Sequence, residues 1–164
     1  MTAQALQLTR SESVTVVDST PERLLVEATY GPGGKPPPKH LHPAQDERVE
    51  IIEGTLRFRL GSVERDLEAG GEIQIPRGVA HQVWNPHDHD AKVAWETVPA
   101  LRTEQWFRSV DRVVRQAGEK DPSPLAFAAL LSEYRDVFRL AVGPDLLVGP
   151  AIKLLGAIGR RVAR

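Results

Sequence analysis

The 164-residue sequence contains no cysteine. It therefore cannot form disulfide bonds, and any metal site in it has to rely on nitrogen and oxygen ligands. The chain also lacks an excess of charge of either sign, with 21 Lys and Arg residues against 22 Asp and Glu residues. Without a net field to attract nucleic acid or an acidic membrane, we expect no nucleic-acid partner.

Signals for export and for membrane insertion are missing as well. The first ten residues have neither a basic leader nor a long apolar run, so we expect no secretory signal and a cytoplasmic location. The long stretch with the fewest charges runs from Leu140 to Gly159, but it contains Pro144, Asp145, Pro150 and Lys153. These residues interrupt a spanning helix, so the sequence predicts no integral membrane segment.

Most of the first hundred residues have the pattern of β-strands. Short β-branched runs occupy residues 14–17 and 24–26, and apolar residues alternate with polar ones over residues 48–53, 56–60 and 63–67. Gly61 and Ser62 separate the last two segments and predict a two-residue hairpin, with Arg57 and Arg59 facing acidic cross-strand partners. A chain of this length has room for one domain with a sizeable core and an appendage.

Four side chains that can bind a metal occur within this β-rich region. His40 and His42 are two residues apart, so on an extended strand both imidazoles lie on one face. Glu47 follows after a short bend, and His81 has to arrive from a distant strand. The prolines at positions 36–38 keep the approach to His40 extended, and we interpret them as a rigid surface connector without a ligand role.

The spacing of these residues forms two motifs. Residues Gly34 to Gly54 read Gly-x5-His-x-His-x4-Glu-x6-Gly, and residues Gly70 to Asn85 read Gly-x5-Pro-x-Gly-x2-His-x3-Asn. In this order, with a gap suited to one hairpin, they resemble the two motifs of the cupin superfamily with no position missing. The resemblance covers residues 10–98. It implies a small, mainly β protein, with a double-stranded β-helix (jelly-roll-like) barrel over residues 1–99.

The resemblance also implies that His40, His42, Glu47 and His81 hold a metal. Three neutral imidazoles and one carboxylate suit one divalent transition metal, Fe(II), Mn(II), Ni(II), Co(II) or Zn(II). Such a set leaves one or two coordination positions open for water or a substrate, and the sequence does not choose among the metals. Asp46 precedes Glu47, but the motif spacing selects Glu47 and leaves Asp46 as a solvated neighbour.

Other polar residues near the motifs have simpler interpretations. His87 and His89 are also two apart, but they lie in a polar, proline-containing segment outside both motifs, so we expect solvated loop residues. Gln82 and Asn85 are candidates to hold the ring nitrogens of the histidines, because metal-bound histidines donate their free N–H to an oxygen. For Asn85, a turn residue is the alternative.

After Pro99 the apolar period changes to that of helices, which predicts a helical extension over residues 100–164. We expect a first helix from Thr103 to about Gly118 and a second from Ser123 and Pro124 through Phe138 to residues 143–144. A third is expected to begin at Pro150. These two to three helices are expected to cover the outside of the barrel or a partner subunit. The alternatives are a lid over the barrel mouth and a cationic tail at a membrane surface.

Two classes of function remain open for such a protein, and both use a small-molecule ligand at the barrel mouth. One is a metal-dependent enzyme of oxygenase-like or isomerase-like activity, with Glu47 as ligand and candidate proton acceptor. The other is a non-catalytic ligand-binding or sensory module, favoured because no second catalytic acid or base stands out. The resemblance further suggests a homodimer formed through outer strands, with contributions from Ile52 and Leu67.

Overall fold

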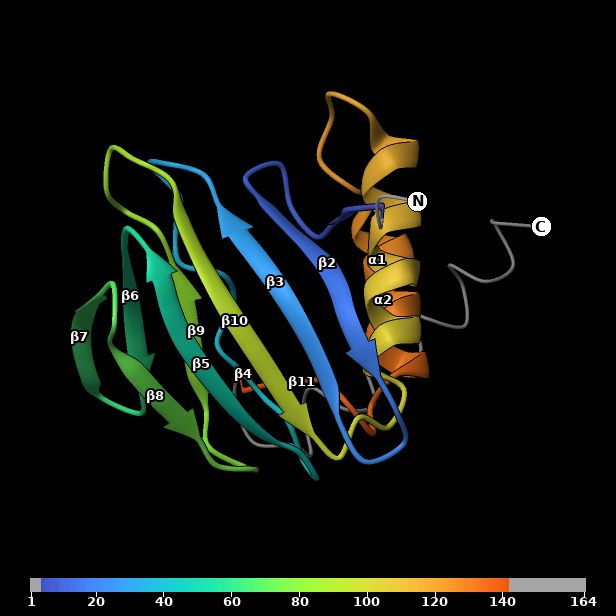
Figure 1. Ribbon diagram of the computed structural model, residues 1–164. Coiled ribbons are helices and arrows are strands. Elements are labelled where there is room, and N and C mark those ends of the chain that lie inside the picture. The colour runs from blue at the N-terminus through green and yellow to red at the C-terminus, as the bar shows by residue number, and fades with distance from the viewer. Residues whose placement is uncertain (1–3, 142–164) are drawn as a thin grey trace.

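The computed structural model describes residues 4–141, which form two antiparallel sheets with two helices at one side (Figure 1). The six-stranded sheet has the order β1-β2-β3-β10-β5-β8, and the five-stranded sheet has the order β11-β4-β9-β6-β7. The strands are β1 (Leu6–Gln7), β2 (Glu12–Ser19), β3 (Leu24–Tyr30), β4 (His40–Leu41), β5 (Asp46–Glu53), β6 (Thr55–Leu60), β7 (Val63–Glu68), β8 (Glu72–Ile75), β9 (His81–Trp84), β10 (Ala91–Val98) and β11 (Arg139–Leu140).

The alternation of apolar and polar residues decides which side of each sheet faces inward. On β5, Val49 and Ile51 are buried, whereas Arg48, Glu50 and Ile52 are exposed, as a two-residue period predicts. The expected hairpin across Gly61 is also present, since Leu60 pairs with Val63. The prediction of a mainly β double-stranded β-helix followed by helices is therefore confirmed.

The predicted ion pairs of this hairpin are present on its exposed face. The guanidinium of Arg57 donates to Asp66 at 2.6 Å, and that of Arg59 donates to Glu64 at 2.8 Å. Because both pairs lie at the surface, each contributes only a few tenths of a kcal/mol to about 1 kcal/mol. Their role is to fix the strand register.

Two helices follow the last long strand and share the hydrophobic core of the sheets. Helix α1 (Thr103–Ala117) ends at Gly118 and buries Trp106, Phe107 and Val110, while α2 (Pro124–Glu133) begins after Ser123, as the sequence predicts. In Figure 1 the two helices lie side by side next to β1 and β2. Within residues 4–141 no helix has both the length and the apolar character needed to cross a membrane.

The predicted extent of the second helix is wrong. It ends at Glu133 instead of continuing to residue 143, and Phe138 lies beyond it. The tertiary structure overrides the apolar period here: the Tyr134 hydroxyl hydrogen-bonds to Ser109 of α1 at 2.9 Å, and Arg102 pairs with Asp136 in the following turn. The chain then forms β11, which pairs with β4. The third helix expected from Pro150 lies outside the described residues.

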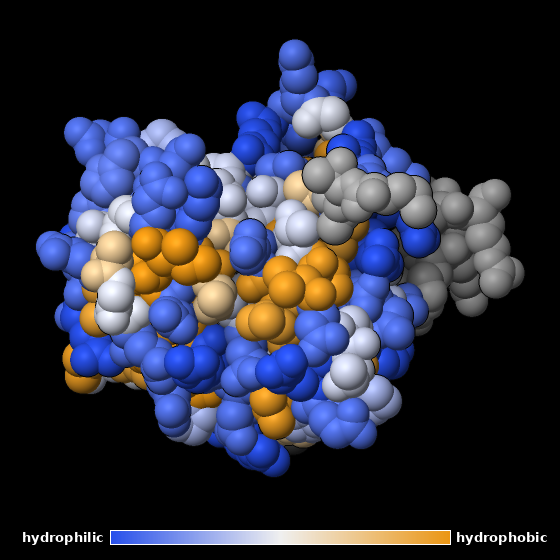
Figure 2. Space-filling model, in the orientation of Figure 1, coloured by the Kyte–Doolittle hydropathy of each residue, from blue (hydrophilic) through white to orange (hydrophobic). Residues whose placement is uncertain are grey.

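The outer surface carries scattered apolar side chains among polar ones. Figure 2 shows apolar patches separated by polar side chains on one face. Ile52 is 52% exposed, as a contact residue would be, but Leu67 is partly buried and packs against the core of its own chain. The homodimer stays a prediction.

Candidate metal centre

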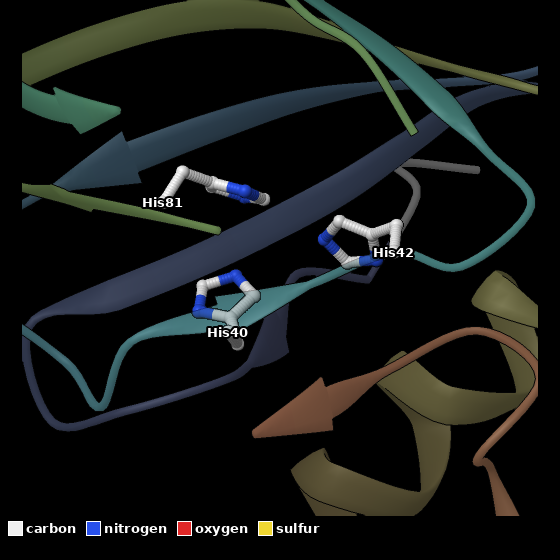
Figure 3. A group of neighbouring side chains, drawn as sticks. All are labelled: His40, His42 and His81. Carbon is white, nitrogen blue, oxygen red and sulfur yellow. The ribbon is translucent and has the colours of Figure 1, made fainter. Parts of the chain in front are cut away.

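Strand pairing in the smaller sheet brings the three expected histidines together. His40 on β4 is the register partner of His81 on β9, and His42 follows β4 directly. One ring nitrogen from each of the three histidines lies within 4.8 Å of the others, and Figure 3 shows the three imidazoles grouped in this way. The three histidines are therefore positioned to bind a metal ion.

The other ring nitrogen of each histidine is held by the main chain. Nδ1 lies 3.0 Å from the Pro38 carbonyl oxygen in His40, 2.5 Å from that of Val137 in His42, and 2.9 Å from that of Val79 in His81. A carbonyl oxygen can only accept, so Nδ1 carries the hydrogen in each ring. In a neutral imidazole this leaves the lone pair on Nε2, which is the tautomer that a metal ligand needs.

Glu47 reaches the same place from β5 of the opposite sheet. Its Oε1 lies 3.3 Å from Nε2 of His42, and its Oε2 lies 3.3 Å from Nε2 of His81. The Trp95 indole N–H donates to Oε1 at 3.0 Å and fixes the carboxylate. The structure thus brings together all four residues that the motifs single out. We call His40, His42, Glu47 and His81 the candidate centre.

The electrostatics of the candidate centre favour a positive charge inside it. Burial raises the pKa of the Glu47 carboxyl, but the charge of His42 and the hydrogen bond from His81 outweigh burial and bring this pKa down to about 2. Burial and the neighbouring histidines lower the pKa of His40 to about 3, so its ring stays neutral. Burial also lowers the pKa of His81, but the hydrogen bond and charge of Glu47 more than compensate and raise it above its usual value.

An unpaired atom tests whether these residues fit a metal. Nε2 of His42 is buried and has no hydrogen-bond partner among the described residues, although Glu47 lies 3.3 Å away. Buried polar atoms are rarely left in this state, and each exception needs an explanation. A cation between the imidazoles and the carboxylate would satisfy this lone pair. The donor set, nitrogen with one carboxylate oxygen, fits a divalent transition metal.

The candidate centre opens into a cavity of about 630 Å³. Its walls come from the inner faces of both sheets, through residues such as Val49, Ile75 and Val83, and from helix α1. A space of this size accommodates a small organic molecule. The further large apolar lining residues from the helical extension are Trp106, Phe107, Val110, Val114, Phe127, Val137, Phe138 and Leu140.

Residues of the helical extension line the cavity beside the candidate centre, which is the position that the lid alternative describes, and the lid stays a prediction. Phe138 stacks on the His40 ring with centroids 4.5 Å apart, and on Trp106 at 4.9 Å. The carbonyl of the adjacent Val137 accepts the hydrogen of His42. The segment after α2 is therefore in direct contact with two residues of the candidate centre.

The expected supporting roles of Gln82 and Asn85 are wrong. Asn85 donates to the carbonyl oxygens of Tyr30 and His89 at 3.0 and 2.7 Å, so it is the turn residue of the alternative interpretation. Gln82 donates to the Pro37 carbonyl at 2.6 Å and reaches no histidine of the centre. Main-chain carbonyls fill that role instead. The proline connector also does more than expected, because Pro37 and Pro38 line the cavity.

The expectations for Asp46 and His89 are confirmed, whereas His87 is not solvated as expected: its side chain is half-buried, with Nε2 3.5 Å from Asp66. Asp46 forms an exposed ion pair with Arg77 at 2.5 Å and turns away from the centre. His87 and His89 stack on each other in the loop before β10, with ring centroids 5.9 Å apart. Neither belongs to the group of histidines that could hold a metal in the described part of the chain.

The sequence gives no hint of a second acidic group in the cavity, but the structure contains one. Glu12 on β2 lines the cavity and accepts a hydrogen bond from the Tyr30 hydroxyl. Glu12 and Tyr30 are register partners on β2 and β3. From the sequence alone, a polar residue at the start of a strand is expected to be solvated. The position of Glu12 in the cavity follows only from the structure, in which residues of α1 line the same cavity.

Comparison with known proteins identifies the fold family. The sequence profile of the family described as Cupin domain matches residues 26–96, which contain both motifs and all four residues of the candidate centre. Together with the two facing sheets, this match shows that the chain carries a small domain of the cupin superfamily.

A curated protein is similar to part of this chain. Over 64 residues the chain is 38% identical to a protein named as an oxidoreductase from Arthrobotrys oligospora; the match covers 38% of this chain and 25% of that protein. The chain thus spans about a quarter of the relative's length.

Solved structures share the fold at low sequence identity. An RmlC-like cupin from Shewanella frigidimarina superposes with a TM-score of 0.56 at 17% identity, covering 62% of this chain and 88% of that one. A cupin-superfamily sugar phosphate isomerase from Silicibacter pomeroyi gives 0.51 at 23% identity, covering 56% and 61%.

Proposed function

We propose that this protein is a metal-dependent enzyme of oxygenase-like or related oxidoreductase activity that acts on a small, largely apolar molecule. The proposed ligands of one divalent transition metal (Fe, Mn, Ni, Co or Zn) are His40, His42, Glu47 and His81. The observation that carries the proposal is the group of three imidazoles, each offering one ring nitrogen within 4.8 Å of the others, beside the Glu47 carboxylate and with every Nδ1 held by a main-chain carbonyl. A protein that only needed a packed core would have no use for this arrangement.

The residues around the site would orient the metal ligands and exclude water from the metal. When bound, a metal of this class supplies a Lewis acid and, for iron or manganese, a redox partner. Trp95 holds the Glu47 carboxylate in place, and the three carbonyls fix the imidazole rings. The apolar walls and the lid from α1 and α2 exclude water, which strengthens electrostatic interactions at the site.

The lining of the cavity favours an oxidoreductase over a sugar phosphate isomerase. A phosphate group calls for Arg or Lys side chains that can contact it. The described cationic side chains that line this cavity are Arg10 and Lys120, both of them exposed, and Arg10 already pairs with Asp121. The name of the relative from Arthrobotrys oligospora points the same way, whereas the isomerase named above shares the fold alone.

Metal analysis combined with oxygen consumption tests this function. Protein from metal-supplemented medium should contain about one transition metal per chain. Loaded with each candidate metal in turn, it should consume dioxygen, or convert the added compound, with at least one member of a panel of phenols, enols and apolar carboxylic acids. If no metal form turns over any compound of the panel, the enzymatic proposal is wrong.

A ligand-binding or sensory module is the second candidate, and one observation favours it. Val137 and Phe138 contact His42 and His40, so binding at the site would change the stability of the segment that follows α2. In this case a ligand would leave the protein chemically unchanged and increase amide hydrogen-exchange protection over residues 134–141. Unchanged protection at saturation would argue against this second function.

A further inference from the structure

A second polar group lies in the cavity, separate from the candidate centre. Glu12 on β2 and Tyr30 on β3 are register partners, and both side chains line the cavity. The Tyr30 hydroxyl donates a hydrogen bond to the Glu12 carboxylate. Tyr30 is buried, at 7% exposure, and Glu12 is partly buried.

No cation among the described residues compensates the Glu12 carboxylate. Arg10, two residues away, pairs with Asp121 at 3.5 Å and donates to the Glu119 carbonyl. Burial therefore raises the pKa of Glu12 to about 7, against the smaller lowering effect of the Tyr30 hydrogen bond. A carboxyl with such a pKa can both accept and return a proton at neutral pH, which is the property of a general base.

Tyr30 is a stable hydrogen-bond donor to this carboxylate. Burial raises its pKa well above the usual value, and the charges of Glu12 and Glu47 raise it further. Its hydroxyl therefore stays protonated and holds Glu12 in one orientation. The influence of Glu47 also shows that Tyr30 lies within electrostatic reach of the candidate centre.

The rest of the wall limits what can bind between these polar groups. Apart from the candidate centre, Glu12 and the exposed residues Arg10, Lys120 and Asp121, the described lining side chains are uncharged and mostly apolar. A matching molecule would have an apolar body and a weakly acidic hydroxyl group whose oxygen can bind the metal. Phenols and enols have this combination.

We propose that Glu12 is a catalytic base that takes the hydroxyl proton of a phenolic or enolic substrate, with Tyr30 as its positioning residue. This inference rests on the proposed metal-dependent function. In the step, the substrate O–H bond breaks and its electron pair stays on the substrate oxygen. An O–H bond forms on the Glu12 carboxyl, so one negative charge passes from Glu12 to the substrate. The step is a proton transfer and needs no oxidant.

Difference infrared spectroscopy with para-chlorophenol and zinc-loaded protein tests the proton transfer without relying on turnover. Zinc is redox-inert, so the bound phenol is not consumed. At about pH 8, where Glu12 is mostly ionised, binding of the phenol should produce the C=O band of a protonated carboxyl. The Glu12→Gln variant should bind zinc normally and lose this band. Tyr30→Phe should keep the band at a shifted frequency, because the carboxyl loses its hydrogen-bond partner.

The outcomes separate this inference from the proposed function. Wild-type protein that binds zinc and para-chlorophenol without the new band overturns the role of Glu12 and leaves the metal centre intact. The role of Glu12 is also overturned, with the metal centre intact, if the band persists in Glu12→Gln or if the zinc-loaded protein does not bind the phenol. Wild-type protein that binds no zinc overturns the metal centre and, with it, this inference. Glu27→Gln, an exposed carboxyl on β3, is the matched control and should keep the band.

Discussion

His42 donates its Nδ1 hydrogen to the carbonyl oxygen of Val137, which lies 95 residues further along the chain, at 2.5 Å. The two residues belong to parts of the sequence with different periods: the first follows a barrel strand and the second follows a helix. The barrel thus supplies the side chains of the candidate centre, and the helical extension supplies part of what orients them. The geometry of the candidate centre therefore depends on both the barrel and the helical extension.

Removal of the imidazoles should remove the metal. The triple variant His40→Ala, His42→Ala, His81→Ala should contain no transition metal after growth in metal-supplemented medium, because three of its four ligands are gone. The matched control is His87→Ala, His89→Ala, a pair with the same spacing in the loop before β10. Elemental analysis should find wild-type metal content in the control. Equal metal content in the triple variant would refute the assignment.

Loss of the Trp95 hydrogen bond should weaken metal binding without unfolding the barrel. In Trp95→Phe the Glu47 carboxylate loses its indole donor, and such changes around a ligand lower metal affinity by about 10–100-fold. Trp84→Phe, a buried tryptophan on β9 whose ring lies against Arg59, is the control. Competition with a chromophoric zinc chelator measures both affinities. If the two variants bind zinc equally well, Trp95 does not support Glu47.

Truncation of Phe138 should open the lid next to His40. Phe138→Ala removes the stacking on His40 and on Trp106 and should lower the free energy of unfolding by about 2–3 kcal/mol, somewhat less than for a fully buried ring because Phe138 is partly buried. It should also speed the release of zinc to a chelator. Phe127→Ala is the control, because Phe127 packs on Trp106 but has no ring contact with the histidines. Comparable zinc release from both variants would contradict a gating role for Phe138.

The raised pKa of Glu12 should make stability depend on pH. The folded protein favours the protonated carboxyl, so its stabilising effect is complete below pH 4.5 and is lost as the pH rises through about 7. The stability of Glu12→Gln relative to wild type should therefore increase from about pH 5 to about pH 8, by at most about 3 kcal/mol. Urea unfolding of metal-free protein measures this. If the difference in the free energy of unfolding between Glu12→Gln and wild type is constant with pH, Glu12 is not desolvated in the folded protein.

The strands could be predicted because their signals are local and periodic. A two-residue period decides which side of β5 faces inward and places His40 and His42 on one face, whereas the selection of Glu47 and His81 rests on the resemblance to the cupin motifs. The start of α2 could be predicted as well, since Pro124 at the first helical position is a strong local signal. In the strands and at this helix start, the residues that determine the structure are neighbours in the sequence.

The features that the sequence did not reveal depend on contacts between distant segments. The end of α2 is decided by the contacts of Tyr134 with Ser109 of α1 and of Asp136 with Arg102, against an apolar period that continues to Phe138. The carbonyl of Val137 is a main-chain atom that any residue would provide, so it has no sequence signature. Glu12 looks like a surface carboxylate until α1 closes the cavity above it.

The bond between His42 and Val137 also has a consequence for biosynthesis. Ribosomes release a protein from its N-terminus, and domains fold as they emerge. All four proposed ligands leave the ribosome well before Val137, which has to emerge before the His42 ring can be fixed in the tautomer that a metal ligand needs. The nascent barrel would hold these residues in an incomplete arrangement, and firm capture of a metal would be delayed until the helical extension has also been made.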